Sequence, residues 1–280
     1  CRAELWCRYL ACSNLDLASE EDEVEDAAVD GGRILPAIVV SASDCIEFGS
    51  TETWRHCLAH EGEFTLESDR ESVGEMCRAA LDLKLQELSA SLRDLDLFRV
   101  LVSRREDLTG AEERARSVEK FLADFKFPSM EKAAKVRRGI GGLACATLSG
   151  DLPMMRRLFD ARASLTTRAK EMFEVGIGPD FTPLFLAVLR SRHNTDALEL
   201  LLQLRSDPNE DAGPSSCALG WCPSARAVEV MVQARADVNR VSGPPFRITP
   251  LQTAAMTHQR HEVFSMLLEK KADLHKLGHG

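Results

Sequence analysis

The feature that most restricts the fold of this chain is a helical motif that recurs in its second half. In the best copy, residues 249–255 read Thr-Pro-Leu-Gln-Thr-Ala-Ala and residues 271–275 read Lys-Ala-Asp-Leu-His. In a second copy, residues 182–187 read Thr-Pro-Leu-Phe-Leu-Ala and residues 205–209 read Arg-Ser-Asp-Pro-Asn. Paired apolar residues lie between the two ends of each copy, at spacings typical of a helix face. The sequence therefore predicts repeated helix pairs.

Two further copies are degenerate and match only part of the motif. The earliest begins with Gly-Gly-Leu-Ala-Cys-Ala at 141–146, and the third keeps only its second half, which ends in Arg-Ala-Asp-Val-Asn at 235–239. The basic residues that open the four closing segments lie 43, 30 and 36 residues apart; they are Arg162, Arg205, Arg235 and Lys271. Their mean spacing is close to the period of about 33 residues of one class of helical repeat.

Each part of the motif has a physical reason. Thr is a good N-cap, and Pro suits the first helical position because its missing N–H has no partner there. A small Ala lets antiparallel helices approach closely, and Gly150 can adopt the left-handed conformation that ends a helix. One helix pair cannot bury its own apolar face, so we expect the pairs to stack.

These motifs strongly resemble the ankyrin repeat. The resemblance implies a mainly α-helical chain whose C-terminal domain, residues 129–280, is an ankyrin-type α-solenoid of about four degenerate repeats over 141–275. It also implies a scaffold or adaptor that binds another protein. The third copy lacks Thr-Pro-Leu, and Lys or Arg replaces the usual turn glycine in all four copies. A basic residue at a helix C-terminus suits the helix dipole, so we expect the fold to survive.

Residues 1–128 are expected to form a partial α/β to helical region. Residues 33–41 form a short β-branched run that we interpret as a buried strand, and the acidic run 20–26 is a charged linker or loop. Capping boxes at Ser68 and Thr109 each predict a helix start, whereas residues 97–102 are compatible with either strand or helix. Pro128 marks the expected domain boundary. Because the chain opens on Cys1, we expect it to begin inside an element of a longer protein.

Residues 1–48 resemble, more weakly, the C-terminal half of a TIR-like domain. The resemblance rests on Cys-Arg-Ala-Glu-Leu at 1–5 and on Ile-Leu-Pro-Ala-Ile-Val-Val-Ser-Ala-Ser-Asp at 34–44. It implies that Glu4 occupies the position of the glutamate used by NAD-cleaving members. An alternative function is therefore the C-terminal part of a TIR-like signalling or NAD-cleaving protein whose repeats select the target. A generic helix-to-strand unit with Glu4 exposed is the other interpretation.

Charge and cysteine content limit the other functions. The formal net charge of −9 argues against nucleic-acid binding, which needs clustered Lys and Arg, and no apolar run is long enough to predict a membrane span. The nine cysteines include no C-x-x-C pair, which favours buried thiols in the reducing cytoplasm. His56 and His60 could serve a zinc site, but incidental histidines on a helix are the simpler interpretation. We expect no cofactor or metal, and no enzymatic activity.

The expected partner-binding residues lie in two long junctions between repeats. Residues 166–181 contain Arg168, Met172 and Phe173, and residues 240–248 contain Phe246 and Arg247. Phe and Arg are common interface anchors. An alternative remains open, in which these loops fold back and the two phenylalanines cover the edge of the stack.

Overall fold

The computed structural model describes residues 37–42, 45–49, 66–91, 94–106, 116–172, 175–192, 194–212, 216–244, 246–256 and 261–276. The chain divides into two compact units. Unit 1 comprises Cys1–Glu112 and Glu174–Gly176, and unit 2 comprises Glu113–Phe173 and Ile177–Gly280. The division lies earlier than the predicted boundary at Pro128, because α6 (Val118–Asp124) packs on α7 (Met130–Ala134) within unit 2.

Unit 1 contains a β-hairpin at the place where the sequence predicts a strand. Strand β1 (Ala37–Ala42) pairs antiparallel with β2 (Cys45–Gly49), and the register shifts between Val40 and Ala42. From residue 37 onward the predicted segment is a strand, and its earlier residues lie outside the described residues. Its partner is the segment directly after it in the chain.

Two helices form the remaining described part of unit 1. Helix α3 (Glu67–Ser91) packs against α4 (Leu95–Ser103), and both contribute buried leucines. Helix α3 begins at Glu67, so Ser68 lies inside the helix instead of capping it. The segment left open by the sequence is helical, because the Asp94 side chain caps α4 by accepting a hydrogen bond from Leu97 N at 2.9 Å.

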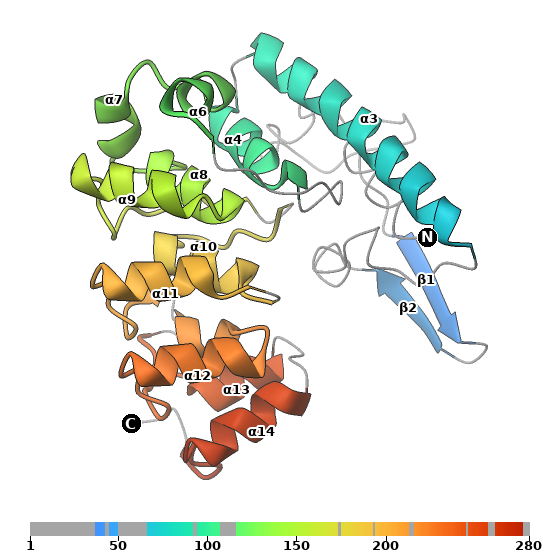
Figure 1. Cartoon of the computed structure of the whole chain (residues 1–280). Coiled ribbons are helices and arrows are strands. Elements are labelled where there is room, and N and C mark those ends of the chain that lie inside the picture. The colour runs from blue at the N-terminus through green and yellow to red at the C-terminus, as the bar shows by residue number, and fades with distance from the viewer. Residues whose placement is uncertain are drawn as a thin grey trace, which may run out of the picture. The chain divides into compact units, whose positions relative to one another are not determined.

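Unit 2 is built from helix pairs that follow one another in chain order (Figure 1). After α6 and α7 come α8 (Gly142–Ser149), α9 (Leu152–Asp160), α10 (Pro183–Arg190) and α11 (Asp196–Gln203). The hairpin β3 (Asp211–Ala212) and β4 (Ser216–Cys217), the 3₁₀ helix η4 (Ala218–Trp221), α12 (Ala225–Gln233), α13 (Pro250–Met256) and α14 (His261–Glu269) complete it. The expectation of a mainly helical chain is confirmed.

The pairs are arranged in two rows. The first helices pack on one another in the order α8, α10, η4 and α13, and the second helices do so in the order α7, α9, α11, α12 and α14. Among the largest fully buried side chains are Met154, Met155, Leu158, Leu184 and Phe185. These side chains come from the first two predicted copies, and Leu267 of the last copy is buried as well, whereas its neighbour Leu268 is exposed.

The two degenerate copies differ in whether they keep a first helix. In the third copy, which lacks Thr-Pro-Leu, η4 takes the place of the first helix. A Cβ atom added at Gly220 would lie 2.4 Å from Thr253 Cβ, so glycine is what allows α13 to approach η4 this closely. The first copy keeps its first helix, which ends at Gly150 in the left-handed conformation with φ 70°.

Candidate protein-binding surface

The turns that close the second helices hold four basic residues in the left-handed backbone region. Arg162, Arg205, Arg235 and Lys271 have φ values between 68° and 72° and exposed side chains. Each follows the last turn of a second helix, where glycine is the usual residue because it has no Cβ. These are the positions at which the sequence departs from the usual turn glycine, so every turn keeps the geometry without the glycine.

Asparagine side chains connect the last three of these turns in succession. The Asn209 side chain donates to Arg235 O at 3.1 Å and accepts from Asp237 N at 2.8 Å. One layer further on, Asn239 donates to Lys271 O at 3.0 Å and accepts from Asp273 N at 2.7 Å. Because both pairs of bonds cross from one layer to the next, they fix the register of neighbouring turns.

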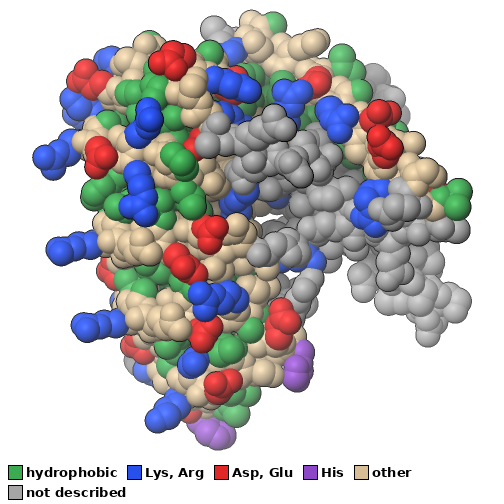
Figure 2. Space-filling view, viewed as in Figure 1, with side chains coloured by type: hydrophobic (Ala, Val, Ile, Leu, Met, Phe, Trp, Pro, Cys, Tyr) green, Lys and Arg blue, Asp and Glu red, His purple; other side chains and the backbone are tan. Residues whose placement is uncertain are grey.

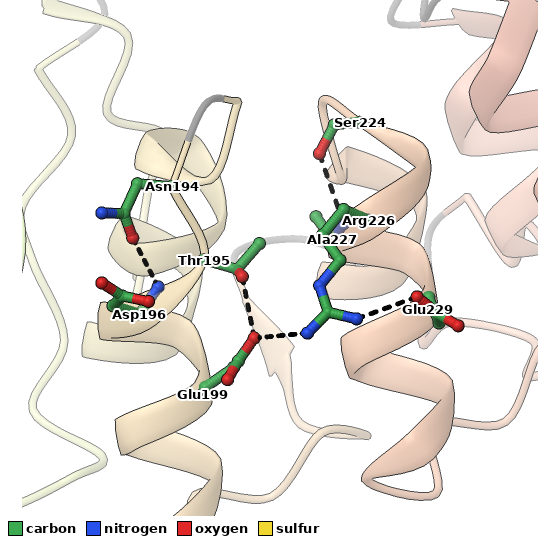
Figure 3. Close-up of polar contacts among 8 residues, drawn as sticks. All are labelled: Asn194, Thr195, Asp196, Glu199, Ser224, Arg226, Ala227 and Glu229. Atoms are coloured by element: carbon green, nitrogen blue, oxygen red, sulfur yellow. Dashed lines mark hydrogen bonds and ion pairs between the residues drawn. The ribbon is translucent and has the colours of Figure 1, made fainter.

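A second set of polar contacts joins layers on the outer side of the second helices (Figure 3). Arg226 on α12 lies between two carboxylates, with its guanidinium 2.9 Å from Glu199 on α11 and 2.9 Å from Glu229 on its own helix. The Thr195 hydroxyl donates to the same Glu199 oxygen at 2.8 Å. These partners raise the pKa of Arg226, with the hydrogen bond to Glu229 as the first cause. The charges of α11 and α12 are therefore largely satisfied within the chain.

The junction 166–181 folds back on itself. Met172 and Ile177 exchange backbone hydrogen bonds of 2.8 and 3.1 Å, and Ala169 N donates to Phe181 O at 2.9 Å. Met172 is only 7% exposed, so its side chain supports the junction and we remove it from the candidate surface as a correction. Phe173 lies outside the described residues. Arg168 is exposed.

The junction 240–248 is a tight loop. Ser242 N donates to Ile248 O at 3.0 Å, and the Ser242 hydroxyl accepts from Ile248 N at 3.0 Å. Phe246 is 55% exposed, which is unusual for a large apolar side chain. Arg247 beside it is also exposed and has φ 47°. This loop therefore leaves more than half of its aromatic side chain accessible.

Asp211 contacts one arginine from each of the two junctions. Its carbonyl oxygen lies 3.5 Å from Arg168 Nη1, and its carboxylate accepts from Arg240 Nη2 at 3.0 Å. Sequence reasoning missed this residue, because Asp211 follows a degenerate turn and only the packing of layers places it between the two arginines. Arg168, Phe246 and Arg247 form the candidate surface, and Asp211 links the loops that carry them.

Glu210 lies next to Asp211 and is the most perturbed carboxyl group in this region. It accepts a hydrogen bond from the Thr182 hydroxyl of the preceding layer. Burial raises the pKa of Glu210 to about 7, with the nearby Asp207 charge adding to the rise while Thr182 and Arg168 oppose it. Thr182 was expected to cap α10 with its side chain, but no such bond forms and the hydroxyl points to Glu210 instead.

The cysteines of the third layer are packing residues. Cys217 and Cys222 are buried and free, and burial raises the pKa of Cys217 to about 11 and that of Cys222 further. Such thiols stay protonated and unreactive at neutral pH. Trp221, between them in sequence, makes an edge-to-face contact with Phe181 at 5.7 Å between ring centroids.

Other candidate groups can be placed only in part. Glu4, His56 and His60 lie outside the described residues. Within the ranges that the structure describes, no three His, Cys, Asp or Glu side chains are grouped as metal ligands would be. Over the same ranges, no helix combines the length and the apolar character needed to cross a bilayer.

Comparisons with known proteins find matches among solved structures but none among family models or curated proteins. No family model matches the chain, and no curated protein does. Among solved structures, the chain is similar to one described as the Bd0816 predatory endopeptidase from Bdellovibrio bacteriovorus in complex with immunity protein Bd3460. That match has 14% sequence identity and a TM-score of 0.40, and it covers 64% of this chain and 98% of the other.

This match corrects one expectation. The sequence led us to expect no enzymatic activity, and a structural neighbour described as an endopeptidase contradicts that expectation, which we withdraw. A likeness at a TM-score of 0.40 carries no argument for a particular activity of this chain.

Proposed function

We propose that this chain is a protein-recognition module of the ankyrin-repeat type that acts as an adaptor in the cytoplasm. The recurring Thr-Pro-Leu and Asp-x-Asn motifs support the proposal, because they coincide with helix starts at Pro183 and Pro250 and with the asparagine contacts between layers. The described cysteines support the compartment, since Cys77, Cys145, Cys217 and Cys222 are all buried thiols.

The observation that carries the proposal is the exposure of Phe246 on a tight loop. A large aromatic side chain that is 55% exposed and held by local backbone bonds loses little conformational freedom when a partner covers it. Arg247 beside it and Arg168 across Asp211 add donors for carboxylate or carbonyl groups of a partner. Aromatic and arginine side chains in such clusters commonly dominate the binding energy of protein interfaces.

The test is a quantitative capture experiment with the full chain. The unaltered protein is compared with Phe246→Ala and with Met256→Ala, a matched control that removes an equally exposed apolar side chain of the same layer. Proteins retained by the unaltered chain and by the control, but lost from Phe246→Ala, are then purified and titrated. We expect an affinity loss of about tenfold or more for Phe246→Ala, as for an interface hot spot.

Two results would remove the proposal. One is a titration in which the purified partner binds Phe246→Ala as tightly as the unaltered chain. The other is reproducible retention of no protein at all by any of the three forms. Circular dichroism on each variant separates loss of binding from loss of fold.

A further inference from the structure

Basic residues are concentrated at the start of unit 2. Residues 116–170 contain 12 Lys and Arg and 5 Asp and Glu, a formal charge of +7, although the whole chain carries −9. All of these residues lie in a described range, and 10 of the basic side chains are exposed against 3 of the acidic ones. The excess positive charge is therefore on the surface.

The outer sides of α7 and α9 carry part of this charge. The two helices pack on each other, and their inward residues, such as Ala133 and Met155, are buried. Lys132 on α7 and Arg156 and Arg157 on α9 are exposed. Figure 2 shows Lys and Arg side chains projecting from the end of unit 2 that these helices form. We call Lys132, Arg156, Arg157 and Arg162 the basic face.

The basic face differs from the rest of the outer row in how its charges are used. On α11 and α12, Glu199 and Glu229 neutralise Arg226. On α9, Arg156 occupies the position equivalent to these glutamates, six residues before the left-handed turn residue. Glu131 on α7 is bonded to Lys135 at 2.7 Å. A backbone hydrogen bond and the Ser117 side chain lower the pKa of Glu119, and the charge of Arg157 adds a smaller contribution. Three exposed acids cannot neutralise ten exposed basic groups.

We propose that the basic face binds an acidic segment of a partner protein. This inference rests on the proposed function only in taking the partner to be a protein, and it names a surface separate from Phe246. An acidic segment suits the face because Arg and Lys recognise carboxylates with charge-assisted hydrogen bonds. Screening limits such attraction to about 10 Å at ordinary salt, so the face acts on its local charge and not on the net charge of the chain.

The charge of the remaining chain favours a short acidic segment over nucleic acid. Residues 1–115 contain 26 Asp and Glu and 12 Lys and Arg, a formal charge of −14. A polyanion long enough to reach beyond the basic face would gain little from a chain that is elsewhere net negative, whereas a short peptide on α7 and α9 needs only the local positive charge. Among the described residues Phe246 is the large aromatic side chain that is exposed, and Phe159 on α9 is only part-exposed, so the basic face offers no fully exposed ring on which a base would stack.

Fluorescence anisotropy tests the inference with the full chain. The probe is a short labelled peptide of alternating Asp and Glu, and single-stranded DNA of equal charge is the second probe. The test variant combines Lys132→Glu with Arg156→Glu. The matched control combines Arg205→Glu with Arg235→Glu, which makes the same change of net charge at the turns after α11 and α12. If the test variant with both charges reversed does not fold, a neutral variant that combines Lys132→Gln with Arg156→Gln replaces it.

The expected result is roughly a tenfold loss of peptide affinity in the test variant, a smaller loss in the neutral variant, and none in the control. Equal losses in the test and control variants, or tighter binding of DNA than of peptide, would overturn the inference. The acidic residues at 20–26 can also be changed to their amides. If this change raises the affinity for the peptide, the basic face binds the chain's own acidic run instead. Phe246→Ala retains peptide binding, so failure here leaves the proposed function standing.

Discussion

Replacing Asn239 by Ala tests how strongly neighbouring layers of unit 2 are held in register. The change removes two hydrogen bonds that cross between layers, at 3.0 Å to Lys271 O and at 2.7 Å from Asp273 N. Each such bond contributes about 0.5–1.5 kcal/mol net. Both backbone groups lie in an exposed turn, where water replaces part of each lost bond. We therefore expect the free energy of unfolding to fall by about 1–2 kcal/mol.

Urea unfolding followed by circular dichroism measures the effect, with thermal unfolding as a second readout. For a domain of this size, we expect the melting temperature to fall by about 2–4 °C per kcal/mol. Asn194→Ala is the matched control, because its side chain caps only its own turn through Asp196 N at 2.7 Å. The reasoning is refuted if Asn239→Ala unfolds at the same urea concentration as the unaltered chain, or if the control loses more stability.

Three further changes have expected outcomes. Arg235→Gly should raise the free energy of unfolding by about 0.5–1 kcal/mol, because φ is 71° there; a loss of stability in the same urea assay would contradict this. Glu210 has a folded pKa of about 7 against an ordinary value of 4.5, so its contribution to stability is present below about pH 4.5 and lost as the pH rises through 7. Glu210→Gln, which can still accept from Thr182, should therefore be the more stable form at high pH by at most about 3 kcal/mol and lose this advantage in acid; equal pH profiles in thermal melts would refute it. Gly220→Ala should destabilise the chain by about 1–3 kcal/mol, because the new methyl group would collide with Thr253, and an unchanged melting temperature would argue against this close packing.

The helix starts and the closing turns of the repeats were predictable from single residues. Pro183 and Pro250 occupy the first helical positions of α10 and α13, as the Thr-Pro-Leu motif indicates. Thr249 caps α13 as expected, since its hydroxyl accepts from Gln252 N at 3.3 Å and Gln252 returns a bond to Thr249 N. These features depend on neighbours within a few residues, which a local sequence pattern records.

Other local predictions failed because tertiary contacts decided them. Thr182 has the same motif as Thr249, yet its hydroxyl serves Glu210 in the next layer, a partner 28 residues away. The helix start predicted at Thr109 is not among these failures, because it lies outside the described residues; α6 begins after Ser117, whose hydroxyl accepts from Lys120 N.

The candidate surface was predictable only as a pair of loops. Loop length and composition indicated Arg168, Phe246 and Arg247, which are all exposed. The same criteria could not distinguish Met172, which is buried by the backbone pairing with Ile177. Asp211 was missed because it contacts two arginines from different layers, and no spacing in the sequence indicates that these residues lie close together.

Amide hydrogen exchange at Asp237 and Asp273, resolved by NMR in the full chain, tests most directly whether adjacent helix pairs are locked together. Each of these exposed turn amides donates to an asparagine of the preceding layer. Both should be protected in the unaltered chain, and Asn209→Ala should speed exchange at Asp237 while leaving Asp273 slow. Rapid exchange at both positions in the unaltered chain would contradict the stacked arrangement on which the proposed recognition surface depends.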